Sequence, residues 1–214
     1  MSEQDRVAWD ERFRAGDHAD TEADPFLAEL EEYAALIPAT RRALDVACGA
    51  GRNAVWLAER GWDVTGCDIS LEGLRKAQAL AREHGVRLRL FCQDLETIVL
   101  PPVCFDLIVC FFYLQRDLFA ALKGALRPGG LIVYKTYTSD QLQFSGGPRH
   151  PLHLLQPQEL LDAFRDFRVL CYQEIVKGRG VAQLIAQKPP ESAAAGIRKA
   201  DPSLPRHAGT GRSG

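Results

Sequence analysis

The fold is indicated by one ten-residue stretch, Asp45-Val46-Ala47-Cys48-Gly49-Ala50-Gly51-Arg52-Asn53-Ala54. Its first residues continue a short apolar strand, its glycines form a turn, and a helix with an apolar face follows. Such a succession lets the backbone at the turn and at the helix N-terminus come close to a ligand. The spacing Gly49-x-Gly51-x-x-Ala54 also satisfies the dinucleotide-binding fingerprint, which by itself is a weak signal.

Strands and helices alternate along the chain around this stretch. Apolar runs predict strands over residues 41–48, 62–67, 86–92, 105–113, 131–136, 167–175 and 181–186. Helical patterns cover residues 24–36, 52–60, 70–84, 116–126 and 157–164, and Asp24 is the expected N-cap of the first of these. The alternation predicts an α/β fold of the Rossmann-like, doubly wound type. Its seven-stranded sheet should be mostly parallel, with one antiparallel edge strand.

Composition describes an ordinary globular chain. It has 214 residues, of which 46% are hydrophobic and 25% charged, which suits one domain. Lys and Arg number 26 against 28 Asp and Glu, so the surplus of cations that non-specific nucleic-acid binding needs is missing, and nucleic acid is not an expected partner. No apolar run approaches the roughly 18 to 20 residues of a membrane span. Residues 189–214, rich in Pro, Gly, Ser and Ala, are expected to be a disordered tail.

The cysteines are irregularly spaced and mostly lie in apolar, strand-like runs. They form no CxxC pair, so we expect core residues rather than disulfides or zinc ligands, and no metal site. The polar N-terminus lacks the apolar segment of a secretory signal. Together these features predict a protein of the reducing cytoplasm. The six residues are Cys48, Cys67, Cys92, Cys104, Cys110 and Cys171.

Three acidic residues follow or end consecutive strands. Asp45 stands just before the glycine turn, where a carboxylate disfavours a pyrophosphate but suits an ammonium or a sulfonium. Asp68, about 20 positions after the first glycine, is placed to accept ribose hydroxyls, and Asp94 to accept the exocyclic amine of adenine. Parallel strands meet at one crevice, so the set describes a nucleoside with a cationic appendage. Taken singly, the plainer readings are a tight turn for Gly49 and Gly51, an Asx turn for Asp68 and a solvated loop charge for Asp94.

These residues, with Leu126-Arg127-Pro128-Gly129-Gly130, resemble the class I S-adenosylmethionine-dependent methyltransferases from about Phe26 to Gln187. The stretch Trp9-Asp10-Glu11-Arg12-Phe13 and the Gly-Arg-Asn after the turn resemble the subgroup of tellurite-resistance and thiopurine-type enzymes. The resemblance implies a methyltransferase domain over residues 24–188, S-adenosyl-L-methionine as cofactor and a small-molecule methyl acceptor. That subgroup has a His-Arg pair between its last two strands, whereas this chain has Lys177-Gly178-Arg179-Gly180 there, so the acceptor stays open.

The resemblance also implies roles for individual residues. The glycine turn would wrap the methionine part, with Asp45 at its amino group and Arg52 at its carboxylate. Asp68 would hold the ribose, Asp94 the adenine, and Cys110 would offer its carbonyl to the ammonium. The full expected cofactor set is Asp45, Ala47, Cys48, Gly49, Gly51, Arg52, Asn53, Asp68, Ile69, Asp94, Leu95 and Cys110.

Acceptor-side residues are expected in the N-terminal segment and in the loops after the fourth and fifth strands. Residues 1–23 are expected to form a helical lid over the cofactor, and a loop rich in Arg and His to line an opening for an anionic or polar acceptor. Core packing, helix docking and a solvated loop are the plainer alternatives. The candidates are Trp9, Arg12, Phe13, Tyr113, Tyr137, Arg149, His150 and His153.

No catalytic residue is assigned from the sequence, because in-line transfer from a sulfonium depends mainly on alignment and on exclusion of water. Two other functions are consistent with the same residues. One is a non-catalytic, cofactor-binding regulatory protein. The other is a nicotinamide-dependent oxidoreductase, which Asp45 and Asp94 disfavour.

Overall fold

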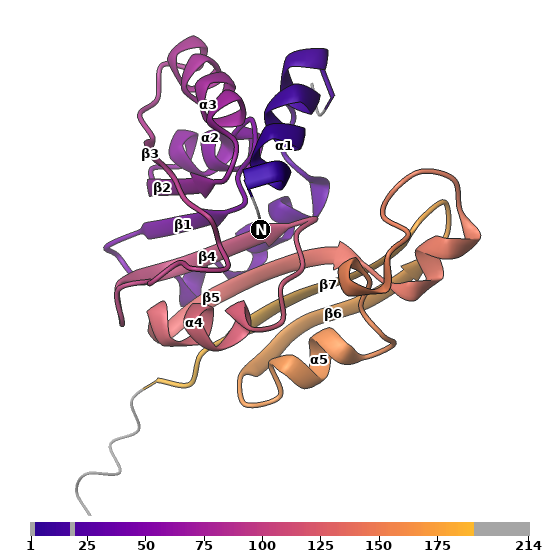
Figure 1. Cartoon of the computed structure of the whole chain (residues 1–214). Coiled ribbons are helices and arrows are strands. Elements are labelled where there is room, and N and C mark those ends of the chain that lie inside the picture. The colour runs from indigo at the N-terminus through magenta and orange to yellow at the C-terminus, as the bar shows by residue number, and fades with distance from the viewer. Residues whose placement is uncertain (1–2, 18–19, 191–214) are drawn as a thin grey trace, which may run out of the picture.

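The computed structural model describes residues 3–17 and 20–190. They form a seven-stranded sheet covered by helices on both faces (Figure 1). The strands are β1 (Arg42–Val46), β2 (Asp63–Asp68), β3 (Arg89–Cys92), β4 (Phe105–Phe111), β5 (Leu126–Tyr137), β6 (Arg168–Val176) and β7 (Gly180–Gln187). The α-helices are α1 (Glu3–Ala15), α2 (Arg52–Glu59), α3 (Leu71–Glu83), α4 (Leu118–Ala125) and α5 (Glu159–Ala163). Shorter-pitched 3₁₀ helices are η1 (Pro25–Leu36), η2 (Ser139–Gln143) and η3 (Pro151–His153).

The strand order is β3-β2-β1-β4-β5-β7-β6. Strands β1 to β5 pair in parallel, and β7 runs antiparallel to both β5 and β6. The predicted doubly wound, mostly parallel sheet is confirmed, and its antiparallel strand β7 lies between β5 and the outermost strand β6. The order reverses beside β1, and at such a switch point the strand ends open a crevice for ligands.

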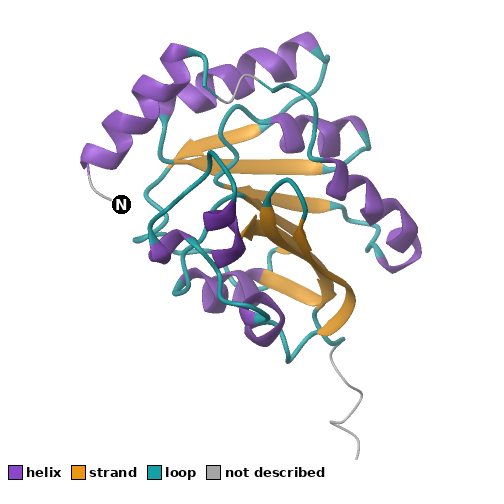
Figure 2. Ribbon diagram, turned by 90° about the vertical axis from the view of Figure 1, so that its right-hand side faces the viewer, coloured by secondary structure: helices purple, strands orange, loops and turns teal. Residues whose placement is uncertain are grey.

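Two cores sandwich the sheet. The side chains of α4 and α5 cover one face, where Phe164, Tyr134 and Ile108 are buried, and those of η1 and α2 cover the other, with Leu27 and Leu57. Figure 2 shows helices flanking the strands on both sides. Every residue of β4 is buried, because this strand contributes alternate side chains to both cores. That position explains why its sequence is almost continuously apolar.

Asp24 begins the helix that covers one face of the sheet, as predicted. Its side chain accepts a hydrogen bond from the backbone N–H of Phe26 at 3.0 Å, which satisfies one of the free donors of the first turn. The helix itself is of the 3₁₀ type and is interrupted at Tyr33, where φ is −103° and ψ is 15°.

The start of β5 differs from the prediction. The expected turn Pro128-Gly129-Gly130 lies inside the strand, which already pairs with β4 at Leu126. The register shifts before Leu131, so the additional residues bulge out of the ladder. Gly130 is required there, because a Cβ atom would lie 2.9 Å from the carbonyl oxygen of Arg127.

The N-terminal segment is helical, as expected, and α1 stands beside α3 (Figure 1). The predicted disordered tail lies outside the described residues from position 191 onward. None of the helices described between residues 3 and 190 combines the length and the apolar character that a membrane crossing requires.

Candidate functional site

The turn after β1 brings unusual backbone conformations together. Ala47, Gly49 and Gly51 all have positive φ, of 56°, 52° and 81°. A Cβ atom on Gly51 would lie 2.6 Å from the Cβ of Ala77 in α3, so this glycine is needed for the close approach of α3 as well as for the turn. The turn therefore exposes bare backbone at the carboxyl end of β1, where the cofactor is expected.

Asp45 lies directly below this turn with a free acceptor. Its side chain is buried, and within the described residues Oδ2 has no hydrogen-bond partner. Burial, and to a smaller extent the neighbouring charge of Asp68, raises the pKa of this carboxyl to about 8. Buried polar atoms of native proteins almost always have a partner, so an unpartnered one marks a place for a ligand donor. The ammonium of a methionine moiety could donate the hydrogen bond that Oδ2 does not receive, and its positive charge suits a carboxylate.

Asp68 joins the glycine turn to the turn between β2 and α3. Its Oδ2 accepts from the N–H of Gly49 and its Oδ1 from the N–H of Ser70, both at 2.8 Å. The bond to Ser70 is the Asx turn of the plainer reading, and the bond to Gly49 goes beyond it. Burial raises the pKa of Asp68, although both hydrogen bonds act in the opposite direction. A carboxylate has about four lone-pair sites, so Asp68 retains capacity to accept a ribose hydroxyl.

Asp94 follows β3 in a tight turn. The N–H of Gln93 donates to the backbone oxygen of Asp68 at 2.9 Å, which holds the start of this turn against the end of β2. Asp94 itself is half-buried, and its Oδ1 accepts from the N–H of Glu96 at 2.9 Å, while Leu95 is buried. The Asp94 and Leu95 backbone thus reaches the same edge of the sheet as Asp68.

The remaining expected cofactor residues also lie near this edge of the sheet. Two of them, Arg52 and Asn53, make contacts within the protein that give them a structural role. Cys48, Ile69 and Cys110 are buried, and Cys110 is in register with the last residue of β1. The guanidinium of Arg52 forms an ion pair with the carboxylate of Asp20, with 3.6 Å between nitrogen and oxygen. The side-chain oxygen of Asn53 accepts a hydrogen bond from the N–H of Asp24 at 2.9 Å. Arg52 and Asn53 therefore hold the segment between α1 and η1 against α2, and their cofactor role stays a prediction.

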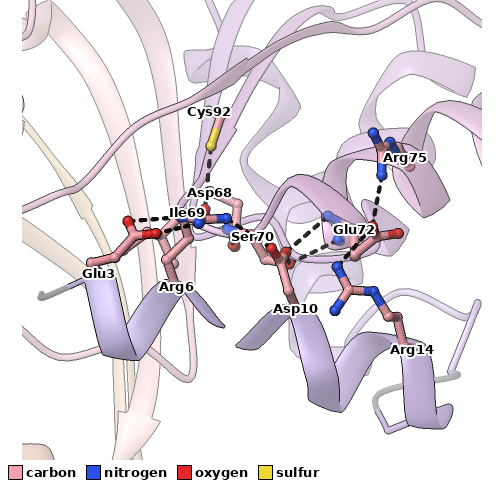
Figure 3. Close-up of polar contacts among 11 residues, drawn as sticks. Glu3, Arg6, Asp10, Arg14, Asp68, Ile69, Ser70, Glu72, Arg75 and Cys92 are labelled. Atoms are coloured by element: carbon pink, nitrogen blue, oxygen red, sulfur yellow. Dashed lines mark hydrogen bonds and ion pairs between the residues drawn. The ribbon is translucent and has the colours of Figure 1, made fainter. Parts of the chain in front are cut away.

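Asp10 fastens α1 to the same region (Figure 3). Its Oδ1 accepts from the hydroxyl of Ser70 at 2.7 Å and from the N–H of Glu72 at 3.1 Å. The Ser70 oxygen in turn accepts from the N–H of Gly73 and caps α3. Burial alone would raise the pKa of Asp10, but these hydrogen bonds and the charges of Arg14 and Arg6 together outweigh it, and the pKa lies below its ordinary value. Asp10 belongs to the stretch Trp9-Asp10-Glu11-Arg12-Phe13, but the sequence did not predict its contact with α3.

Phe13 seals α1 against the glycine turn. It is buried, and its ring lies 3.1 Å from where a Cβ atom of Gly49 would stand and 2.9 Å from that of Gly73. Trp9 is half-buried with its ring centroid 6.1 Å from that of Phe13, and Arg12 lies over Trp9 at 5.0 Å. The structure thus brings the predicted trio to the cofactor side of the sheet, with Phe13 in direct contact with it.

The acceptor-side candidates are more dispersed. The hydroxyl of Tyr113 donates to Gln115 at 2.6 Å, and burial raises the pKa of Tyr113. Tyr137 ends β5 and is half-buried. Arg149 donates to the backbone oxygens of Leu142 and Phe144, both at 2.9 Å, so it holds its own loop together.

His150 and His153 lie exposed in the same loop with ring centroids 5.9 Å apart. Their part in acceptor binding stays a prediction, as does that of Arg149.

One residue near the site was not predicted. Lys135, near the carboxyl end of β5, is buried, and its ammonium donates to Asp24 at 2.7 Å. The signal in the sequence is a lysine directly after the apolar run Leu131-Ile132-Val133-Tyr134. Its partner is far away along the chain, so the pair depends on the tertiary structure.

Part of the chain matches a known methyltransferase family. Residues 43–130 match the family described as a methyltransferase domain. The ubiquinone biosynthesis O-methyltransferase of Idiomarina loihiensis is 34% identical over 102 residues, covering 45% of this chain and 42% of that protein. The malonyl-[acyl-carrier protein] O-methyltransferase of Pseudescherichia vulneris is 36% identical over 126 residues, covering 56% of this chain and 46% of that protein. The chain thus spans less than half the length of these curated relatives.

Solved structures share the fold. TehB from Haemophilus influenzae superposes with a TM-score of 0.66 at 17% identity, covering 84% of this chain and 67% of that one. Others with the same fold are described as S-adenosylmethionine-dependent methyltransferases. Residues 43–130 of this chain therefore match a methyltransferase domain, and its fold is the one shared by solved structures described as S-adenosylmethionine-dependent methyltransferases.

Proposed function

We propose that this protein methylates an oxygen atom of a small-molecule acceptor. When bound, S-adenosylmethionine would supply an activated methyl group, with its sulfonium sulfur as leaving group when the oxygen–carbon bond forms; an ionised acceptor oxygen has no proton to lose, and a hydroxyl would release its proton to solvent. The observation that carries the proposal is the buried Asp45 oxygen without a partner in the described residues, next to a turn of bare backbone. The two curated relatives are both named O-methyltransferases, which supports oxygen as the acceptor atom.

The chain's own residues would bind and orient the cofactor. Asp45 would accept from the amino group, the turn from Ala47 to Gly51 would follow the methionine part, and Asp68 would accept from the ribose. Asp94 would face the adenine. Each of these groups is held by backbone contacts before the ligand arrives, so little ordering is needed on binding.

The contribution of the protein to the rate would be alignment and exclusion of water. Well-oriented reactants can lower a barrier by roughly 7 to 11 kcal/mol. We propose that residues 1–23 act as the lid that excludes water and that residues 24–188 form the methyltransferase domain. The docking of Asp10 and Phe13 on the ribose side supports this division. A cytoplasmic location is supported by six cysteines, all described and all free.

Calorimetric titration with S-adenosylhomocysteine tests the binding half of the proposal. Asp68→Ala and Asp94→Ala should each weaken binding by about tenfold or more, as expected for loss of charged hydrogen bonds. Asp63→Ala is the matched control, since Asp63 lies at the opposite, exposed end of β2. Unchanged affinity in folded Asp68→Ala and Asp94→Ala proteins would overturn the assignment of the site.

Transfer of a labelled methyl group tests the reaction. A screen should include phenols, carboxylic acids, thiols and amines, with nucleic acid as a further arm. Label on an oxygen acceptor supports the proposal. Tight binding of S-adenosylhomocysteine without transfer to any acceptor would instead favour the non-catalytic, regulatory alternative.

A further inference from the structure

Lys135 has donors that the fold does not use. It is 6% exposed, which is rare for a lysine, and its position in β5 is in register with Phe111 at the end of β4. An ammonium has three N–H groups. Across the described residues, its one hydrogen bond goes to Asp24 at 2.7 Å. A buried cation at the carboxyl ends of β4 and β5 is therefore left with capacity for a further acceptor.

Two aromatic rings accompany this cation. Phe112 and Tyr137 have ring centroids 5.2 Å apart, and the ammonium of Lys135 lies 5.7 Å from the centroid of Phe112. Both rings are half-buried at the end of the sheet. The two ring planes are tilted by 44° and offer apolar surface beside a cation, which is suited to an aromatic ligand that bears a negative charge.

The backbone at Phe112 is strained. Its φ is 58°, a conformation that bulky residues rarely adopt, and its N–H donates to the backbone oxygen of Lys135 at 2.7 Å. Strain of this kind persists where the surrounding structure holds a residue in place, and it concentrates at functional sites. The hydrogen bond holds the backbone of Phe112 against that of Lys135.

The need to hold Asp24 in place does not by itself explain why a buried lysine is present at position 135. The Asp24 carboxylate already caps η1, and its N–H is held by Asn53. A buried ion pair gains little over well-packed apolar side chains of similar volume, because both charges lose their hydration. A charge kept at this cost, at the end of the sheet where ligands bind, indicates a use in binding.

We propose that Lys135 binds an anionic oxygen of an aromatic acceptor whose ring packs against Phe112 and Tyr137. The inference rests on the proposed function and narrows its acceptor to an aromatic molecule that carries a carboxylate or an ionised phenol. Lys135 is a specificity-determining residue in this assignment, and the cofactor residues at β1 and β2 are separate from it.

The test compares matched charged and neutral probes on protein saturated with S-adenosylhomocysteine. One pair is 4-hydroxybenzoate and 4-hydroxybenzamide, and the other is 4-nitrophenol at a pH where it is ionised and 4-nitroanisole. Calorimetry on the wild-type protein should show at least one anion bound about tenfold or more tightly than its neutral counterpart. The pair that shows the preference identifies the anion as a carboxylate or a phenolate. Equal affinities within both pairs would overturn the proposal.

Two variants separate acceptor binding from anchoring. Lys135→Met keeps the side-chain length and should abolish the preference, while the affinity for S-adenosylhomocysteine stays within about twofold. Asp24→Asn removes the ion pair but keeps the cation, so the preference should persist. Equal losses for charged and neutral probes in both variants would show that the pair only anchors the chain, and would overturn the proposal without touching the proposed function. If Lys135→Met fails to fold, the wild-type and Asp24→Asn measurements still decide.

Discussion

The carboxylate of Asp10, on the N-terminal helix, lies 2.7 Å from the hydroxyl of Ser70, at the start of α3. Ser70 also donates its N–H to Asp68, which in turn holds Gly49. A continuous set of hydrogen bonds therefore runs from α1 to the glycine turn. Any movement of α1 away from α3 would remove an acceptor from a residue that touches the ribose side of the expected cofactor site.

Replacement of Asp10 by Ala should loosen this connection. The Ser70 hydroxyl and the Glu72 N–H lose their acceptor, which should cost about 1 to 3 kcal/mol of unfolding free energy. If α1 acts as a lid, the dissociation constant of S-adenosylhomocysteine should also rise by about tenfold. Denaturant unfolding and calorimetry measure the two effects, with exposed Glu11→Ala as control. Lost stability with unchanged affinity would show that α1 braces the fold without covering the ligand.

Gly51→Ala should be more destabilising than a similar change elsewhere. Gly51 and Gly85 both have positive φ, so alanine at either position costs about 1 kcal/mol of backbone strain. At Gly51 the new methyl group also meets Ala77 at 2.6 Å, whereas Gly85 has open space, so about 1 to 3 kcal/mol more is expected. Urea unfolding of the two variants gives the comparison. Equal losses would mean that α3 moves aside at no cost.

Asp45→Asn should stabilise the ligand-free protein at high pH. The folded-state pKa is about 8, against an ordinary value of 3.8, so the folded protein binds more protons between these values. Its stability should therefore fall as pH rises from about 4 to about 8, and the asparagine variant should lack this fall. We expect the two proteins to be similar at about pH 4 and the variant to be more stable by about 2 to 5 kcal/mol at pH 9.

Thermal unfolding across this pH range measures the effect, and parallel profiles would contradict it. The same variant should bind S-adenosylhomocysteine more weakly than the parent does. Opposite changes in stability and in affinity are expected of a residue kept for its ligand.

Asp106→Ala should lower the stability of the protein and leave its affinity for S-adenosylhomocysteine unchanged. This buried carboxylate accepts from Thr40 at 2.6 Å, from the N–H of Arg42 at 2.8 Å and from Arg127 at 3.0 Å. It lies near the amino end of β4, away from the carboxyl ends of the strands. Loss of one partner from a buried pair costs about 3 to 5 kcal/mol. Unfolding experiments should show this loss, and a marked rise in the S-adenosylhomocysteine dissociation constant would contradict the placement of the site.

Local patterns were sufficient for much of the fold. The apolar run at residues 105–113 predicted a strand buried on both faces, and the Asp24-Pro25 pair predicted the start of a helix. Both are confirmed, because each depends on neighbours in the sequence. The start of β5 was misplaced, because a bulge is set by pairing with β4, which local turn residues do not report.

The candidate site likewise contains residues that local sequence patterns predict and contacts that they do not predict. Asp45 and Asp68 were predicted as site residues from their distance to the glycine turn, which is a local signal. The pairing of Lys135 with Asp24, and of Asp10 with Ser70, joins residues far apart in the chain. Such contacts depend on strand register and helix docking, so no spacing in the sequence could predict them.

The antiparallel strand β7 has a consequence for how the chain must assemble. It lies between β5 and β6, although it is the last of the described strands to be synthesised. Until it arrives, β5 has an unpaired apolar edge and β6 has no strand beside it. We therefore expect nascent chains that end before residue 180 to remain open to aggregation, and the sheet to close only in a late, cooperative step.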